Sequence, residues 1–138
     1  MEVGSWQLNK REGTIKYLST KSVLAIHEEV IGQNELQGLA GNKSIDAVLA
    51  RIDNRITYGM IDDLYELAAC YACYIAVGHA FHDANKRTAF AAMDICLVIN
   101  GIELDFDAEE TGQMIIQAAR GIVDEKELAQ WLRNLAAS

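Results

Sequence analysis

The chain has 138 residues, of which 51% are hydrophobic, and this is enough apolar material for one core and one domain. It carries 12 Lys and Arg against 20 Asp and Glu, and the net charge of -8 argues against general attraction to nucleic acid or to anionic membranes. The chain has three cysteines, an odd number, and no N-terminal signal sequence in which a basic segment precedes an apolar one. These features predict reduced thiols and a cytoplasmic setting. The longest apolar stretch, residues 67–81, is interrupted by Cys, Tyr, Gly and His, so no membrane span is expected.

Proline is absent and Ala, Leu, Ile and Glu are abundant, which favours an all-α fold. Apolar residues recur at helical spacing in six stretches, most of them preceded by a residue that can cap a helix. The six expected helices begin at Ser19–Ser22, Ser44, Asp62–Asp63, Ala84, Asp107 or Thr111, and Asp124. The third and fourth are almost wholly apolar and should bury each other. We therefore expect residues 19–138 to form a compact bundle of about six helices.

Two segments fall outside the helical pattern. Residues 1–18 are expected to form a separate arm. In it, Arg11-Glu12-Gly13 lies between Trp6-Gln7-Leu8 and Ile15-Lys16-Tyr17, a pattern that fits either a short hairpin or an irregular arm. Residues 32–43 contain three glycines, two asparagines and two glutamines. That composition favours turns and a mobile surface loop, and such loops often contact partners.

One polar segment lies between the two apolar helices. It reads His79-Ala80-Phe81-His82-Asp83-Ala84-Asn85-Lys86-Arg87 and continues with Thr88. The backbone N–H groups of residues 84–87 open a helix, and with the positive end of the helix dipole they can hold an anion. Lys86 and Arg87 add positive charge where it opposes the dipole, and a bound phosphate would account for that charge.

The same segment supplies the other parts that phosphoryl transfer requires, which is mainly positioning and charge neutralisation. Asp83 is an oxygen ligand suited to Mg²⁺, which usually takes one protein carboxylate together with phosphates and waters. His79 can accept a hydroxyl proton near neutral pH. These residues predict an active site that handles the phosphates of ATP.

The segment resembles the signature of the Fic/Doc family, His-x-Phe-x-Asp/Glu-Gly/Ala-Asn-Gly/Lys-Arg followed by Thr, at every position. The resemblance implies an all-α enzyme that uses ATP and Mg²⁺, with His79 as the base and Asp83 as the metal ligand. It also implies that Phe81 packs the motif loop into the core. The expected phosphate-binding residues are Ala84, Asn85, Lys86, Arg87 and Thr88.

Two positions resemble the Doc, or death-on-curing, branch more than the AMP-transferring Fic branch. Lys86 replaces the usual second glycine, and Phe90 stands where a second arginine is usual. A lysine side chain fills space that a glycine leaves open for the nucleotide, and it adds a point charge. Doc-like members bind ATP in reversed orientation and transfer its γ-phosphate, so the resemblance implies a protein Ser/Thr kinase.

The resemblance to Doc extends over about two thirds of the chain, through residues 46–67 and down to Asn100-Gly101. It implies a toxin that modifies a threonine of elongation factor Tu and arrests translation. It also implies a separately encoded antitoxin, whose helix blocks the site. In the family the loop after the first helix is a flap that pairs with the target as an added strand, and Gly38, Leu39 and Ala40 match its centre.

Other interpretations remain open at this stage. The same site could transfer AMP, or the fold could be a catalytically silent module that binds an antitoxin. The Ser/Thr-x-x-x-Glu-Gly/Asn pattern of self-inhibited Fic relatives is absent, which supports an external antitoxin. Cys70 and Cys73 match Cys-x-x-Cys, but they lie in mid-helix and are predicted to pack in the core. His79, His82 and Asp83 lack the further ligands that a structural zinc site needs.

Overall fold

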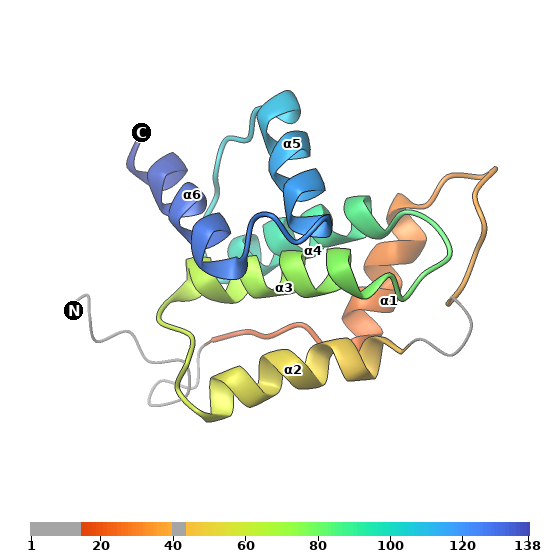
Figure 1. Ribbon diagram of the computed structural model, residues 1–138, viewed down its shortest axis with the longest axis horizontal. Coiled ribbons are helices and arrows are strands. Elements are labelled where there is room, and N and C mark those ends of the chain that lie inside the picture. The colour runs from red at the N-terminus through yellow and green to blue at the C-terminus, as the bar shows by residue number, and fades with distance from the viewer. Residues whose placement is uncertain (1–14, 40–43) are drawn as a thin grey trace.

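The computed structural model describes residues 15–39 and 44–138, and these contain six α-helices (Figure 1). The helices are α1 (Thr20–Val30), α2 (Ile45–Thr57), α3 (Leu64–Gly78), α4 (Asn85–Ile99), α5 (Ala108–Ala119) and α6 (Glu125–Ala137). Within the described ranges the one β-type pairing is an isolated antiparallel bridge between Leu39 and Phe81. The all-α prediction is confirmed. The choice between a hairpin and an arm concerns residues 1–18, and all but the last four of these lie outside the described residues.

The caps read from the sequence set most of the helix boundaries. Five helices are capped by a side chain that accepts a hydrogen bond from the backbone N–H three residues later, and the capping residues are Ser19, Ser44, Asp63, Asp107 and Asp124. Such a cap stabilises a helix by about 1 kcal/mol. Of the two expected starts of α5, the structure has the one at Asp107. Helix α4 differs, because its N-cap is Ala84 and no side chain caps it.

Helix α3 lies at the centre of the bundle. It packs most extensively against α4, and also against α6, α2 and α5, so every residue from Glu66 to Ala76 is buried. In Figure 1, α2 runs along one side of α3 while α5 and α6 lie on the other. The mutual burial of α3 and α4 that their composition predicts is confirmed, and it fixes the polar loop between them at one end of the bundle.

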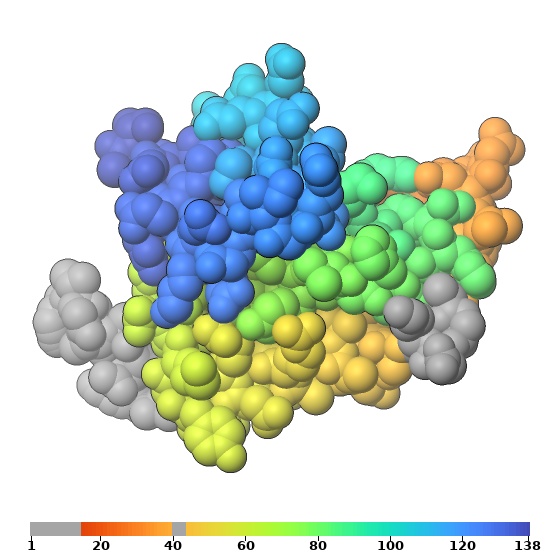
Figure 2. Space-filling view, in the orientation of Figure 1, coloured from red at the N-terminus to blue at the C-terminus, as the bar shows by residue number. Residues whose placement is uncertain are grey.

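Helix α1 reaches the same end of the molecule, because it packs against α4 as well as α2. The chain that leaves α1, residues 31–39, then returns across the start of α4. In the space-filling view this segment, drawn in orange, lies against the green surface of the loop between α3 and α4 (Figure 2). The packing of α1 thus brings a second segment to the polar loop.

The three cysteines are core residues. Cys70, Cys73 and Cys96 are free and buried, and desolvation raises the pKa of each thiol to about 12. Cys70 and Cys73 lie inside α3, which agrees with the packing interpretation of their spacing. Among the described helices, none combines the length and the hydropathy that crossing a membrane would require.

Candidate active site

The polar loop joins the C-terminus of α3 to the N-terminus of α4 and is bracketed by two residues in the left-handed region. His79 has φ 47° and caps the C-terminus of α3, while Ala84 has φ 67° and precedes α4. A residue with a β-carbon pays about 1–2 kcal/mol in this region. A small side chain at position 84 limits that cost, and the two left-handed residues give the loop its sharp turn.

Phe81 fixes the middle of the loop to the protein interior. Its side chain is 2% exposed. The side-chain amide of Asn85 accepts a hydrogen bond from the N–H of Phe81 at 3.1 Å and donates one to its carbonyl oxygen at 2.9 Å. The side chain of Asn85, which the resemblance assigns to phosphate, therefore braces the loop in this structure.

His27, on α1, is a site residue that the sequence analysis missed. It is 3% exposed, and its ring stacks on Phe81 with a centroid distance of 3.7 Å and an interplanar angle of 5°. Its Nε2 lies 2.9 Å from the carbonyl oxygen of Asp83, within hydrogen-bond distance. One signal was available, because His27 stands four residues after Val23 in an otherwise apolar stripe of α1.

The N-terminus of α4, where the sequence predicts an anion site, has no side-chain cap. Thr88 makes the first hydrogen bonds of the helix, from its N–H at 2.9 Å and its hydroxyl at 2.7 Å, both to the carbonyl oxygen of Ala84. The preceding amides, at residues 85–87, lie in the first turn, where α-helices have no internal acceptors, and no side chain caps them. Lys86 and Arg87 are exposed there. Thr88 is buried and shapes the turn.

The end of α1 and the segment after it contact Arg87. Arg87 donates from Nη1 to the carbonyl oxygen of Val30 at 2.8 Å and pairs through Nη2 with the carboxylate of Glu35. The Gly32 N–H, at 2.6 Å, and then Arg87 lower the pKa of Glu35. Sequence reasoning missed Glu35, because its partner is 52 residues away.

The same segment also reaches the loop through its backbone. The N–H of Leu36 donates to Oδ2 of Asp83 at 2.8 Å, and the N–H of His82 donates to the carbonyl oxygen of Gly38 at 3.2 Å. Leu39 forms the isolated bridge with Phe81. We call residues 32–39 the flap. Gly38 and Leu39, two of the expected flap residues, thus contact the polar loop, whereas Ala40, the third, lies outside the described residues.

The catalytic and metal candidates lie at opposite ends of the loop. The side chain of His79 is exposed, and Asp83 is half-buried. No group of three or more His, Cys, Asp or Glu that could hold a metal occurs within residues 15–39 and 44–138. A Mg²⁺ ion that arrives with a nucleotide needs only one or two protein carboxylates, because the phosphates and waters complete its shell. A single carboxylate such as that of Asp83 is compatible with an ion of that kind, and it is the expected ligand.

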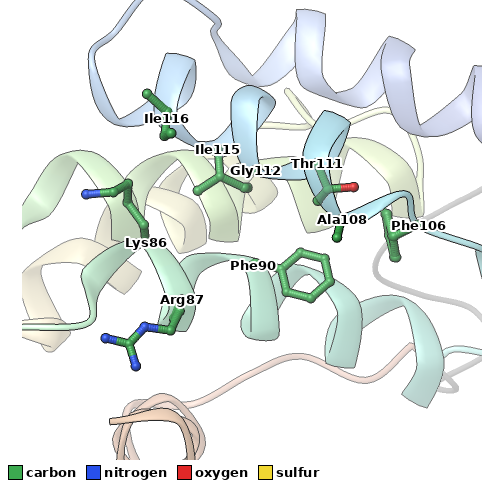
Figure 3. A pocket seen from close by; sticks show the side chains of 9 residues that line it. All are labelled: Lys86, Arg87, Phe90, Phe106, Ala108, Thr111, Gly112, Ile115 and Ile116. Atoms are coloured by element: carbon green, nitrogen blue, oxygen red, sulfur yellow. The ribbon is translucent and has the colours of Figure 1, made fainter. Parts of the chain in front are cut away.

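An open pocket of about 470 Å³ adjoins the start of α4 (Figure 3). Helices α4 and α5 and the chain between them line it. Lys86 and Arg87 lie at one end, and Phe106 lies at the other. Phe90 and Phe106 meet edge to face at a centroid distance of 5.2 Å. The pocket therefore joins an apolar volume to the charged start of α4.

The Fic/DOC family description matches residues 17–97, which include α1 to α3, the polar loop and most of α4. The chain belongs to the Fic/Doc family, as its signature predicts.

Two individual relatives indicate the branch of the Fic/Doc family to which the chain belongs. The chain is 33% identical to Protein kinase doc of Escherichia phage P1 over 125 residues, which cover 90% of this chain and 98% of the relative. It is 35% identical to Toxin Doc of Mycolicibacterium smegmatis (strain ATCC 700084 / mc(2)155) over 98 residues, covering 68% of this chain and 75% of the relative. Both relatives carry the Doc name, so the Doc branch is confirmed, and the first match covers more of the chain than the two thirds expected.

Proposed function

We propose that this protein is a Doc-type toxin kinase, which transfers the γ-phosphate of ATP to a serine or threonine hydroxyl of another protein. The observation that carries the proposal is the uncapped start of α4, where Lys86 and Arg87 stand in the first turn, Asp83 lies two residues before the helix, and His79 lies at the other end of the loop. A helix start of this kind favours bound phosphate through its amides and its dipole. The kinase name of the phage P1 relative supports the same chemistry.

The proposed role of each site residue in phosphoryl transfer follows from its position and its chemical type. The amides of residues 85–87 and the side chains of Lys86 and Arg87 would hold and neutralise phosphate oxygens. His79, exposed at the end of α3, would accept the proton of the attacking hydroxyl. Asn85 and Phe81 would keep the loop in shape, and Asp83 would hold Mg²⁺, whose contribution when bound is to neutralise phosphate charge.

The preference for γ-phosphate over AMP transfer rests on Lys86 and Phe90. Lys86 places a full charge next to the amides, where a glycine would leave room for closer backbone approach. Phe90 lies on the wall of the pocket, one helical turn after Lys86, and offers no charge to a second phosphate group. These features favour an ATP molecule whose terminal phosphate lies at the start of α4.

Phosphate and Mg²⁺ would have to compete with the flap for the charged groups of the site. Glu35 occupies Arg87, and the N–H of Leu36 occupies Asp83. Loading of ATP would therefore exchange these contacts for phosphate and metal contacts, and it would free the flap for a protein target. We propose elongation factor Tu as that target and a separately encoded antitoxin as the inhibitor, as the resemblance to Doc implies.

Expression of the chain without an antitoxin, followed by mass spectrometry of the cellular proteins, tests the proposal. The expected result is growth arrest together with one protein that gains a phosphate on Ser or Thr. The His79→Ala variant should abolish both effects, and His82→Ala should retain them, because His82 is exposed in the same loop but has no place in the signature. A mass gain of AMP would favour nucleotidyl transfer. Arrest that persists in His79→Ala without any modified protein would favour the silent binding module.

A further inference from the structure

We infer that His27 and Thr88 are positioning residues for phosphoryl transfer, which aim the backbone amides of Ala84 and Asn85 at the phosphate. This inference rests on the proposed function, because it takes phosphate oxygens to be bound at the start of α4. It adds the side chains that hold the anion-binding amides in place. It also gives Thr88 an indirect role, in place of the direct phosphate contact that the family resemblance implies.

Each of the two side chains is buried and holds one backbone carbonyl oxygen of the polar loop. His27 is 3% exposed, and its Nε2 lies 2.9 Å from the carbonyl oxygen of Asp83. Because that oxygen can only accept, Nε2 is the ring nitrogen that carries the proton. Thr88 is fully buried, and its hydroxyl donates to the carbonyl oxygen of Ala84 at 2.7 Å. Two consecutive carbonyl groups are therefore held by side chains, one from α1 and one from α4.

The direction of a carbonyl group fixes the direction of the next residue's amide. In a planar trans peptide the C=O and N–H bonds point in opposite directions, and the described part of the chain contains no cis peptide bond. With the carbonyl of Asp83 turned toward His27, the N–H of Ala84 points away from α1. With the carbonyl of Ala84 turned into α4, the N–H of Asn85 points out of the start of that helix.

The same loop contains one peptide group that shows both sides of this arrangement. The side-chain amide of Asn85 donates to the carbonyl oxygen of Phe81 at 2.9 Å. The N–H of the same peptide group, that of His82, donates at 3.2 Å to the carbonyl oxygen of Gly38 in the flap. A side chain that holds the carbonyl on one side thus presents the amide to an acceptor on the other. For the amides of Ala84 and Asn85 that acceptor is a phosphate oxygen.

The backbone at Ala84 needs such support. Its φ of 67° and ψ of 25° are left-handed, a conformation that is unfavourable for a residue with a β-carbon. Asn85 begins α4, and a left-handed residue followed by a helical one forms a concave group of amides of the kind that binds anions. Thr88 holds the Ala84 carbonyl twice, through its hydroxyl and through its N–H at 2.9 Å. These bonds oppose relaxation of Ala84 out of the anion-binding shape.

Substitutions of similar shape can remove each side-chain hydrogen bond separately. Thr88→Val keeps the branched side chain but loses the hydroxyl, whereas Thr88→Ser keeps the hydroxyl. His27→Phe keeps a ring that can stack on Phe81, but the new ring cannot donate. Thr111→Val is the matched control for the loss of a threonine hydroxyl. Thr111 is also buried and lies on α5, and its hydroxyl has no hydrogen-bond partner among the described residues.

The first measurement is the affinity of the full chain for inorganic triphosphate with Mg²⁺, at a temperature at which every variant is folded. Thr88→Val and His27→Phe should each weaken binding by roughly two- to tenfold, the effect of losing one hydrogen bond. Thr88→Ser and Thr111→Val should bind triphosphate as the unsubstituted chain does. A role in stability alone would lower the melting temperatures of Thr88→Val and His27→Phe and leave the affinities of their folded forms unchanged.

The second measurement assigns each side chain to its own amide. Nuclear magnetic resonance of the isotope-labelled chain follows the amide protons as triphosphate is added, because a charge-assisted hydrogen bond moves an amide proton downfield. In the unsubstituted chain the amide protons of Ala84 and Asn85 should both move downfield. His27→Phe should lose mainly the shift of Ala84, and Thr88→Val should lose mainly that of Asn85. Thr111→Val should keep both shifts.

The outcomes separate the two proposals. If Thr88→Val and His27→Phe bind triphosphate as tightly as the unsubstituted chain does, or keep both amide shifts, the two side chains do not aim the amides and the inference is overturned. It is also overturned if Thr88→Ser loses as much affinity as Thr88→Val, because the hydroxyl is then not the cause. The proposed function survives these results, since the unsubstituted chain still binds triphosphate. If the unsubstituted chain does not bind triphosphate, the phosphate site itself is wrong and both proposals fail.

Discussion

His27 provides a quantitative test of how the motif loop is held. In His27→Phe the ring can still stack on Phe81, but the carbonyl oxygen of Asp83 loses its partner at 2.9 Å. An acceptor left unpaired in a partly buried site costs about 1–2 kcal/mol, which lowers the melting temperature of a domain of this size by roughly 3–8 °C. His27→Ala also loses the stacking and leaves a cavity, so it should cost about 2–4 kcal/mol.

Urea unfolding of the unsubstituted chain and of both variants measures these differences. The order of stability should be unsubstituted, then His27→Phe, then His27→Ala. Binding of inorganic triphosphate should weaken in the same order, because the amides at the start of α4 follow directly from Asp83. If His27→Phe is as stable as the unsubstituted chain, the hydrogen bond to Asp83 does not brace the loop and the reasoning is refuted.

Four further predictions concern the Glu35–Arg87 pair, Gly78 and the three cysteines. Glu35→Gln should tighten the binding of inorganic triphosphate, measured by calorimetry, because Arg87 loses its carboxylate partner. An unchanged affinity would show that the Glu35–Arg87 ion pair does not compete with phosphate. The Gly32 N–H, and then Arg87, lower the pKa of Glu35, so its contribution to stability is present above the ordinary carboxyl pKa and is lost as pH falls through the lowered value. Acid titrations of Glu35→Gln should lack that loss. Gly78→Ala should destabilise by about 1–3 kcal/mol in urea, since the new β-carbon would lie 2.9 Å from Cγ2 of Val48. The three cysteines, with pKa raised to about 12 by burial, should stay protonated and react with a thiol reagent at pH 8 only on unfolding.

The sequence predicted the parts of this fold that depend on neighbouring residues. Each capping side chain acts on an amide three residues away, so Asp63 and Asp124 could be assigned as helix starts directly from the chain. The polar loop was predictable because its residues lie between two nearly apolar helices, but the bonds by which Asn85 braces Phe81 were not predicted. Local patterns therefore predicted the six helices and the loop between α3 and α4.

The sequence could not predict what other elements contribute to the site. His27 and Leu36 reach Asp83 across 56 and 47 residues, and only the packing of α1 against α4 brings them there. Contacts of this kind depend on helix packing, which periodicity alone does not specify.

The most direct test of the account is transfer of radioactive label from ATP to the target protein by the purified chain. Parallel reactions with ATP labelled at the γ- or at the α-phosphate, each repeated with His79→Ala and with His82→Ala, compare the two chemistries at one site. The account predicts label on the target from γ-labelled ATP alone, lost in His79→Ala and retained in His82→Ala. Label that reaches the target only from the α-phosphate, or that persists in His79→Ala, would contradict it.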